Sequence, residues 1–242
     1  FPSNLSSIGD WAFASCSGLT SVDLPSSITK MGEYVFYNCK NLSSVKLPSE
    51  ITAISKSALE GCISLKNIEL PAGITSIDEY AFTGCSNLQN INLPSGITTI
   101  GYGAFWNCSN LTNVILPSAL TSIGNSAFAG CISLKNIELP AGITSIDENA
   151  FSQCRNLQNI NLPSGITTIG FGAFWNCTNL TNVILPSALA SIGAIAFANC
   201  SNLANVTLSS NITSIGSSAF SDCKSLKNLT ISKDVTSIKD IR

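Results

Sequence analysis

Residues 62–84 read CISLKNIELPAGITSIDEYAFTG, and residues 85–107 repeat the pattern as CSNLQNINLPSGITTIGYGAFWN. Cysteine opens each copy, and the chain of 242 residues holds ten cysteines at a constant spacing of 23. They are Cys16, Cys39, Cys62, Cys85, Cys108, Cys131, Cys154, Cys177, Cys200 and Cys223. The whole chain is therefore one repeated unit, and the repeat decides the fold.

The apolar positions follow the same period as the cysteines. Each unit approximates C-x-x-L-x-x-[IV]-x-L-P-x-x-I-x-x-I-x-x-x-A-F-x-x, with Leu59 in place of Phe in one unit and Ser209 and Ser232 in place of Pro in the last two. A period of roughly 20–29 residues with this leucine spacing indicates a leucine-rich-repeat solenoid. We expect an α/β repeat fold: a right-handed solenoid of about ten 23-residue coils, with a parallel β-sheet on one face and short helical or 3₁₀ turns opposite.

Each unit predicts one coil of that solenoid. The segment L-x-x-[IV]-x-L alternates inward aliphatic and outward polar side chains, which favours a strand stacked in parallel on its neighbours. Proline ends this strand because it cannot donate a ladder hydrogen bond. The I-x-x-I step that follows fits a second short extended piece, and G-x-x-A-F-x-x-C fits a single helical turn.

Composition excludes several classes of protein. The chain is 45% hydrophobic and 11% charged with a net charge of −2, so it lacks the basic surface of a nucleic-acid binder. No apolar run reaches the roughly 18 residues that span a bilayer, so we expect neither a membrane-spanning segment nor a signal peptide within this sequence. We expect residues 1–242 to form one solenoid domain whose ends are cut within repeats, as in a fragment of a longer protein.

The cysteines allow three interpretations. A disulfide framework is consistent with their even number, whereas buried thiols that pack as small apolar groups are consistent with the repeat symmetry. Stacked coils hold equivalent Cβ atoms about 4.8 Å apart, but a disulfide needs roughly 3.8 Å, so free buried thiols are favoured. A zinc site is disfavoured because the chain has no histidine and no C-x-x-C motif.

The absence of histidine also argues against an enzyme, because hydrolases commonly need an imidazole as base or ligand. Two acidic pairs, Asp78-Glu79 and Asp147-Glu148, occupy equivalent places three coils apart. That separation, roughly 14 Å, exceeds the distance for paired acid and base catalysis, so they are better interpreted as solvated turn residues. We predict no enzymatic activity, no metal ion and no cofactor.

The unit resembles the BspA-like, treponemal type of leucine-rich repeat, whose 23-residue units end in A-F-x-x-C, and the resemblance covers nearly all of the chain. It implies a secreted or surface-displayed protein of a host-associated microbe. Members of this family act as adhesins toward extracellular-matrix and plasma proteins, so a host protein ligand is the implied partner. The resemblance supplies no catalytic residues.

A longer period of 69 residues lies over the 23-residue one. Residues 61–129 and 130–198 differ at only nine positions, most of them outside the inward columns. Variation over a constant core suits a recognition surface. A recent duplication with too little time for further change explains the near-identity equally well.

One candidate binding surface lies on the strand face. The residues seven after each cysteine point outward and vary, and Ile115 and Ile184 are aliphatic where folding does not require it. The candidates are Glu69, Asn92, Ile115, Glu138, Asn161 and Ile184. The residues five after each cysteine are mostly asparagine, which we interpret as a structural ladder of coil-to-coil hydrogen bonds.

A second candidate surface lies on the opposite face. Tyr102 with Trp106, and Phe171 with Trp175, are four residues apart and should touch if the turn is helical. Exposed aromatic residues are enriched in protein interfaces, but they also cover turns without binding anything. Two functions remain open: an adhesin that binds a host protein through one of these faces, and a structural stalk that displays another domain.

Overall fold

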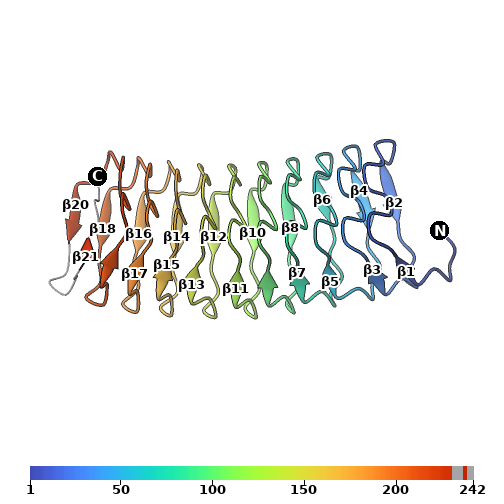
Figure 1. Cartoon of the computed structure of the whole chain (residues 1–242), viewed down its shortest axis with the longest axis horizontal. Helices are drawn as coiled ribbons and strands as arrows, with labels where there is room; N and C mark the ends of the chain where they lie inside the picture. The colour runs from blue at the N-terminus through green and yellow to red at the C-terminus, as the bar shows by residue number, and fades with distance from the viewer. Residues whose placement is uncertain (231–236, 239–242) are drawn as a thin grey trace.

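The computed structural model describes residues 1–230 and 237–238, so Ser232 lies outside the described residues. The chain winds into one elongated stack of coils, and the first and last described coils lie at opposite ends (Figure 1). This arrangement confirms the leucine-rich-repeat solenoid of 23-residue coils.

Two strands occur in each coil, and the first of them builds the strand face. Its strands pair in parallel, and Cα partners such as Asn90 and Asn113 are 23 residues apart. The strands of this face are β2 (Ser21–Asp23), β4 (Ser44–Lys46), β6 (Asn67–Ile68), β8 (Asn90–Asn92), β10 (Asn113–Ile115), β12 (Asn136–Glu138), β14 (Asn159–Asn161), β16 (Asn182–Ile184), β18 (Asn205–Thr207) and β20 (Asn228–Thr230).

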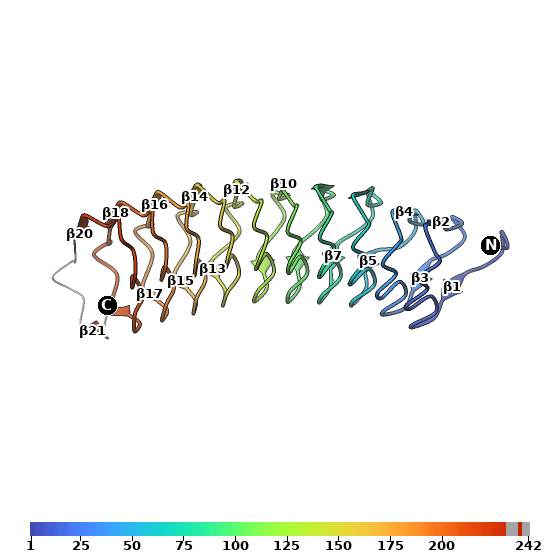
Figure 2. The same ribbon diagram turned by 90° about the horizontal axis from the view of Figure 1, so that it is seen from above.

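The second strand of each coil comes from the I-x-x-I step, so a second series of parallel strands runs along the stack beside the first (Figure 2). Proline separates the two strands in most coils. The strands of this series are β1 (Ser7–Ile8), β3 (Lys30–Met31), β5 (Ala53–Ile54), β7 (Ser76–Ile77), β9 (Thr99–Ile100), β11 (Ser122–Ile123), β13 (Ser145–Ile146), β15 (Thr168–Ile169), β17 (Ser191–Ile192), β19 (Ser214–Ile215) and β21 (Ser237–Ile238).

One apolar core runs the length of the stack and contains the columns expected from the repeat. The phenylalanine rings of successive coils stack almost in parallel; those of Phe82 and Phe105 lie 5.3 Å apart at 2°. Leu59 fills the same column in its coil and is buried. Stacking matters because no single coil could remove its own apolar side chains from water.

The turn before each cysteine is not helical, which corrects the expected helical or 3₁₀ turn: the described residues contain no helix. Two positions per coil, five residues and one residue before the cysteine, have φ between +48° and +73°. Such left-handed residues prevent a run of helical backbone angles. Alternate N–H groups of the turn donate to the neighbouring coil instead, as Phe36 does to the Ala58 carbonyl at 2.8 Å.

The cysteines are free thiols in the structure, and all except Cys16 are buried. Each buried thiol donates a hydrogen bond to a main-chain carbonyl of the neighbouring coil on its N-terminal side, as Cys131 Sγ does to the Phe105 oxygen at 3.2 Å. Burial raises the pKa of these thiols, to about 12 for Cys85 and Cys154. The cysteine column therefore satisfies carbonyl groups inside the core and carries no reactive thiolate there.

Candidate binding surface

The structure brings the six predicted strand-face residues into one exposed row along the stack. Each lies at the end of its strand or one residue beyond, next to an inward aliphatic residue, because side chains alternate between the two sides of a strand. Direct pairing places Asn92 beside Ile115 and Asn161 beside Ile184. We call these outward residues, seven after each cysteine, the strand-face row.

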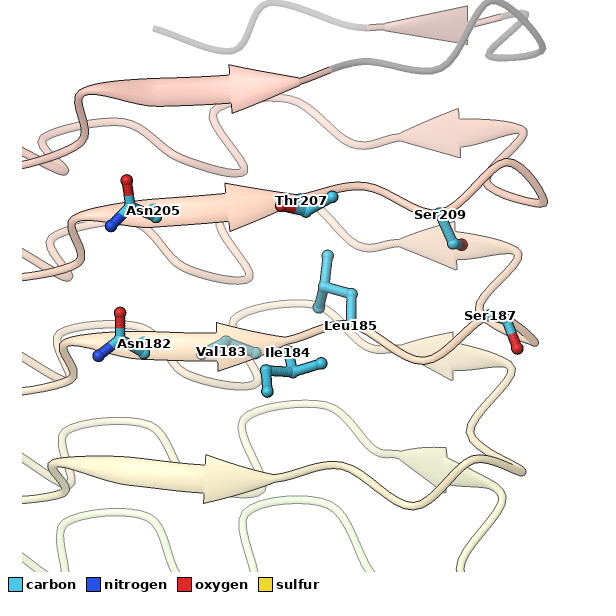
Figure 3. A pocket seen from close by; sticks show the side chains of 8 residues that line it. All are labelled: Asn182, Val183, Ile184, Leu185, Ser187, Asn205, Thr207 and Ser209. Carbon is cyan, nitrogen blue, oxygen red and sulfur yellow. The ribbon is translucent and has the colours of Figure 1, made fainter.

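Two isoleucines are the most exposed apolar members of this row. Ile115 is 64% exposed and Ile184 is 78% exposed. A hollow of about 350 Å³ adjoins Ile184 on β16 and Thr207 on β18, and Leu185 contributes to its lining (Figure 3). A second hollow, of about 190 Å³, lies between β10 and β12 and is lined by Ile115 and Glu138. The two isoleucines thus occupy equivalent places, three coils apart, each beside a shallow depression.

A third hollow, of about 660 Å³, lies another three coils toward the N-terminus. It is lined by Lys46 and Glu69, and Lys46 is the residue equivalent to Ile115 and Ile184. The backbone ladder is reduced at this place to a single bridge between Lys46 and Glu69, and β10 and β12 lack ladder pairing in the described sheets. The three hollows are therefore 69 residues apart along the chain, although β16 and β18 at the first of them are paired in register.

Charge along the strand-face row is mostly negative. Lys46 Nζ lies 3.3 Å from Asp23 Oδ1, and both side chains are largely exposed, so this ion pair is weak. Within the described residues neither Glu69 nor Glu138 has a salt bridge. Glu138, between the two isoleucines, therefore presents an uncompensated carboxylate to solvent.

The asparagine column on the strand face does not form the expected ladder. Among the described side chains, the coil-to-coil asparagine bonds belong to another column, two residues after the cysteine: Asn110 donates to Asn87 at 3.1 Å and Asn179 to Asn156 at 3.1 Å. On the strand face, Asn182 donates to the neighbouring Thr181 hydroxyl at 3.3 Å. The predicted ladder on the strand face was therefore wrong: the coil-to-coil asparagine bonds lie in the turn column, although asparagines of both columns are exposed.

The turn-side aromatics are exposed except Trp175, which is half-buried. The expected contact of Tyr102 with Trp106 does not occur among the described ring pairs; Tyr102 contacts Tyr80 of the preceding coil, with ring centroids 5.0 Å apart. The reason is the left-handed Gly103 between them, which removes helical spacing. The structure therefore does not assemble Tyr102 and Trp106 into one patch.

Sequence reasoning missed an aromatic cluster near the N-terminal end of the stack. The Trp11 and Tyr34 rings stack at 4.0 Å and 3°, and Tyr37 packs edge-on against both. Alignment of the repeats could have revealed it, since Trp11 and Tyr34 occupy the same position in successive coils. Trp11 remains half exposed after stacking.

Polar side chains of the turns pair within a coil or with the next coil. Ser76 donates to Asp78 at 2.9 Å, and Lys56 donates to Glu79 at 2.8 Å, an interaction that raises the pKa of Lys56. The part of the chain that the structure describes contains no cluster of three or more potential metal ligands. It also contains no helix of the length and apolar character needed to cross a bilayer.

Comparison with known proteins identifies related sequences and folds. The profile of the BspA type leucine rich repeat region matches residues 1–110, 52–177 and 121–241. No functionally curated protein gives a significant match.

Several solved structures share the fold. A leucine-rich repeat protein from Bacteroides ovatus is 27% identical with a TM-score of 0.66, over 97% of this chain and 78% of that one. A leucine rich cell surface protein from Faecalibacterium prausnitzii is 26% identical with a TM-score of 0.53, over 96% and 78%. The leucine rich repeat protein of T. pallidum is 26% identical with a TM-score of 0.53, over 85% and 77%.

Proposed function

Because the chain belongs to the family of BspA-type leucine-rich-repeat proteins, we propose that it is a non-enzymatic protein-binding module. In this proposal it is secreted or displayed at a cell surface, where it acts as an adhesin toward host extracellular proteins. The similar protein from Faecalibacterium prausnitzii is described as a cell surface protein, which supports this location. The proposed binding surface is the strand-face row.

The observation that carries the proposal is the pair of exposed isoleucines on a regular sheet. Ile115 and Ile184 each leave most of the side chain in water, although equivalent positions elsewhere hold the polar or charged residues Asp, Lys, Glu, Asn or Thr. Covering an isoleucine that is mostly exposed gains about 1–2 kcal/mol from apolar burial. Because the sheet is fixed by main-chain hydrogen bonds, a partner would cover both side chains without ordering the module.

The experiment compares three double variants that differ only in where the surface is changed. Ile115→Ser/Ile184→Ser alters the strand-face row, and Trp106→Ala/Trp175→Ala alters the turn side. Ile63→Ser/Ile132→Ser is the matched control, because these isoleucines are also 69 residues apart and are 42% and 41% exposed, but lie outside the row. Binding to immobilised fibronectin and fibrinogen is measured by surface plasmon resonance.

We expect the row variant to lose at least tenfold in affinity while the control pair stays within twofold of the parent. Loss only in the tryptophan variant would move the binding surface to the turn side. If the parent binds neither protein, the structural stalk becomes the better account. Circular dichroism of each variant confirms that the fold is retained.

A further inference from the structure

The spacing of the strand-face hollows limits the shape of a partner. Ile115 and Ile184 lie three coils apart, about 14 Å for three steps of the parallel-strand spacing, of which the steps from β12 to β14 and from β14 to β16 are ladder-paired. In an extended polypeptide, residues four apart lie on the same side and are separated by about 13–14 Å. An extended segment that runs along the stack, across the strands, can therefore place two side chains over both isoleucines.

A helical partner does not match this spacing. Residues on one side of an α-helix recur after seven or eleven positions, at about 10.5 Å and 16.5 Å. Neither distance coincides with the separation of the two isoleucines. A helix that covered one isoleucine would therefore place its next side chain about 3 Å from the second one, whereas an extended chain matches both.

The charge between the hollows specifies the middle of such a segment. Glu138 follows Ile115 in the row and has no salt bridge among the described residues. A residue midway between two residues spaced four apart lies on the same side of an extended chain, about 6.8 Å from each. A lysine or arginine at that midpoint would reach the Glu138 carboxylate.

The strand-face asparagine column can form hydrogen bonds with the main chain of the same segment. Asn113, Asn136, Asn159 and Asn182 run parallel to the row, two residues earlier on each strand, and all are exposed. Their amide groups are not used for bonds to one another within the described structure. Side-chain amides both donate and accept, so they can replace the water that an extended main chain loses on docking.

We propose that the strand-face row binds an extended, unpaired segment of its protein partner, with apolar residues at the first and fifth positions and a basic residue at the third. This deepens the proposed function and rests on it. The apolar residues cover Ile115 and Ile184, and the basic residue faces Glu138. The 69-residue period of the chain thus sets the spacing that the ligand must have.

The test uses two labelled peptides of identical composition. Thr-Leu-Thr-Lys-Thr-Leu-Thr has leucines four apart, and Thr-Leu-Thr-Leu-Thr-Lys-Thr has them two apart. Fluorescence anisotropy measures their affinities for the full chain. We expect the first peptide to bind at least tenfold more tightly, a difference of about 1.4 kcal/mol. Its affinity should fall at least tenfold in Ile115→Ser/Ile184→Ser and stay within twofold in Ile63→Ser/Ile132→Ser.

A further variant moves one hydrophobic site by one coil. Ile184→Asn/Thr207→Ile places the isoleucines four coils apart, about 19 Å, close to the 20 Å between extended residues six apart. We expect it to prefer Thr-Leu-Thr-Lys-Thr-Lys-Thr-Leu-Thr over the first peptide. Glu138→Gln should weaken binding of the first peptide several-fold in low salt, with little effect on a version that has Gln in place of Lys.

Equal affinities for the two seven-residue peptides, or no binding of either at millimolar concentration, would overturn the proposed ligand. If the row variant still loses fibronectin or fibrinogen in that case, the row binds a folded surface and the proposed function stands. If neither host protein nor peptide depends on the row, both proposals fail.

Discussion

Alkaline pH should unfold this protein unusually steeply, because its core contains a column of protonated thiols. Burial raises the pKa of nine thiols above the ordinary value of 9.0, and the eight from Cys62 onward include Cys85, at about 12, and Cys223, at about 11. Above pH 9 the unfolded chain releases these protons while the folded chain keeps them. The contribution of the thiols to stability is therefore constant well below pH 9 and decreases as the pH rises through 9 toward the folded pKa values.

The size of the effect follows from the number of thiols. Each buried thiol costs up to about 1.4 kcal/mol per pH unit above 9, so the eight together approach about 11 kcal/mol per unit. A folded domain is stabilised by about 5–15 kcal/mol in total. The chain should therefore lose its structure within roughly one to one and a half pH units above pH 9.

The assay is urea unfolding followed by circular dichroism, at intervals from pH 7 to pH 10.5 with a reductant present. The slope of unfolding free energy against pH gives the number of protons released. The variant Cys131→Ala/Cys154→Ala removes two fully buried thiols and should lower that slope by about a quarter. A slope of one proton or less in the parent, or an equal slope in parent and variant, would refute the buried-thiol core.

Two other predictions concern single features of the coil. In the native protein, iodoacetamide should modify the exposed thiol of Cys16 within minutes, and the buried thiols only after unfolding. Peptide mass spectrometry identifies the modified residues. Rapid modification of Cys131 would contradict the structure. Ile195→Asn should raise the free energy of unfolding by about 1 kcal/mol, because Ile195 has a left-handed φ of 48°, which disfavours β-branched residues. Ser126→Ile at the equivalent position should lower the free energy of unfolding by a similar amount. Equal stabilities of parent and variants in urea would show that the turn conformation is wrong.

The repeat predicted most of the fold because each apolar column has one consistent environment. Phe105, Cys108 and Leu111 belong to columns that stay apolar throughout, so their inward direction could be deduced without the structure. The second strand followed from the I-x-x-I step in the same way. The columns therefore predicted both strands and the core between them.

The turn could not be predicted because neighbouring coils determine its conformation. The left-handed position five residues before the cysteine holds Trp11, Tyr34 and Ile195 as well as glycine, so local preference gives no consistent signal. The N–H groups of these residues donate to the next coil, as Tyr34 does to the Lys56 carbonyl at 2.9 Å, and this bond between coils fixes the turn. The hydrogen bonds between stacked coils therefore override the local conformational preference of these residues.

The candidate surface was predicted in part. Exposure of the strand-face row followed from strand alternation, and Ile115 and Ile184 stood out as aliphatic residues at outward positions. The hollows beside them are formed by side chains of two neighbouring coils together, which no single column of the repeat reveals. The predicted aromatic contacts of the turn side do not form, because they depended on a helical turn that the described residues do not contain.

The central claim, that the strand-face row is the binding surface, is tested most directly by NMR of the isoleucine δ1-methyl groups. The uniformly methyl-labelled chain is titrated with the peptide Thr-Leu-Thr-Lys-Thr-Leu-Thr, and no side chain of the surface has to be changed. The resonances of Ile115 and Ile184 should shift together and saturate at the same peptide concentration, while those of Ile63 and Ile132, equally spaced and also exposed, should stay in place. Shifts confined to Ile63 and Ile132, or no shift at Ile115 and Ile184 at millimolar peptide, would contradict the account.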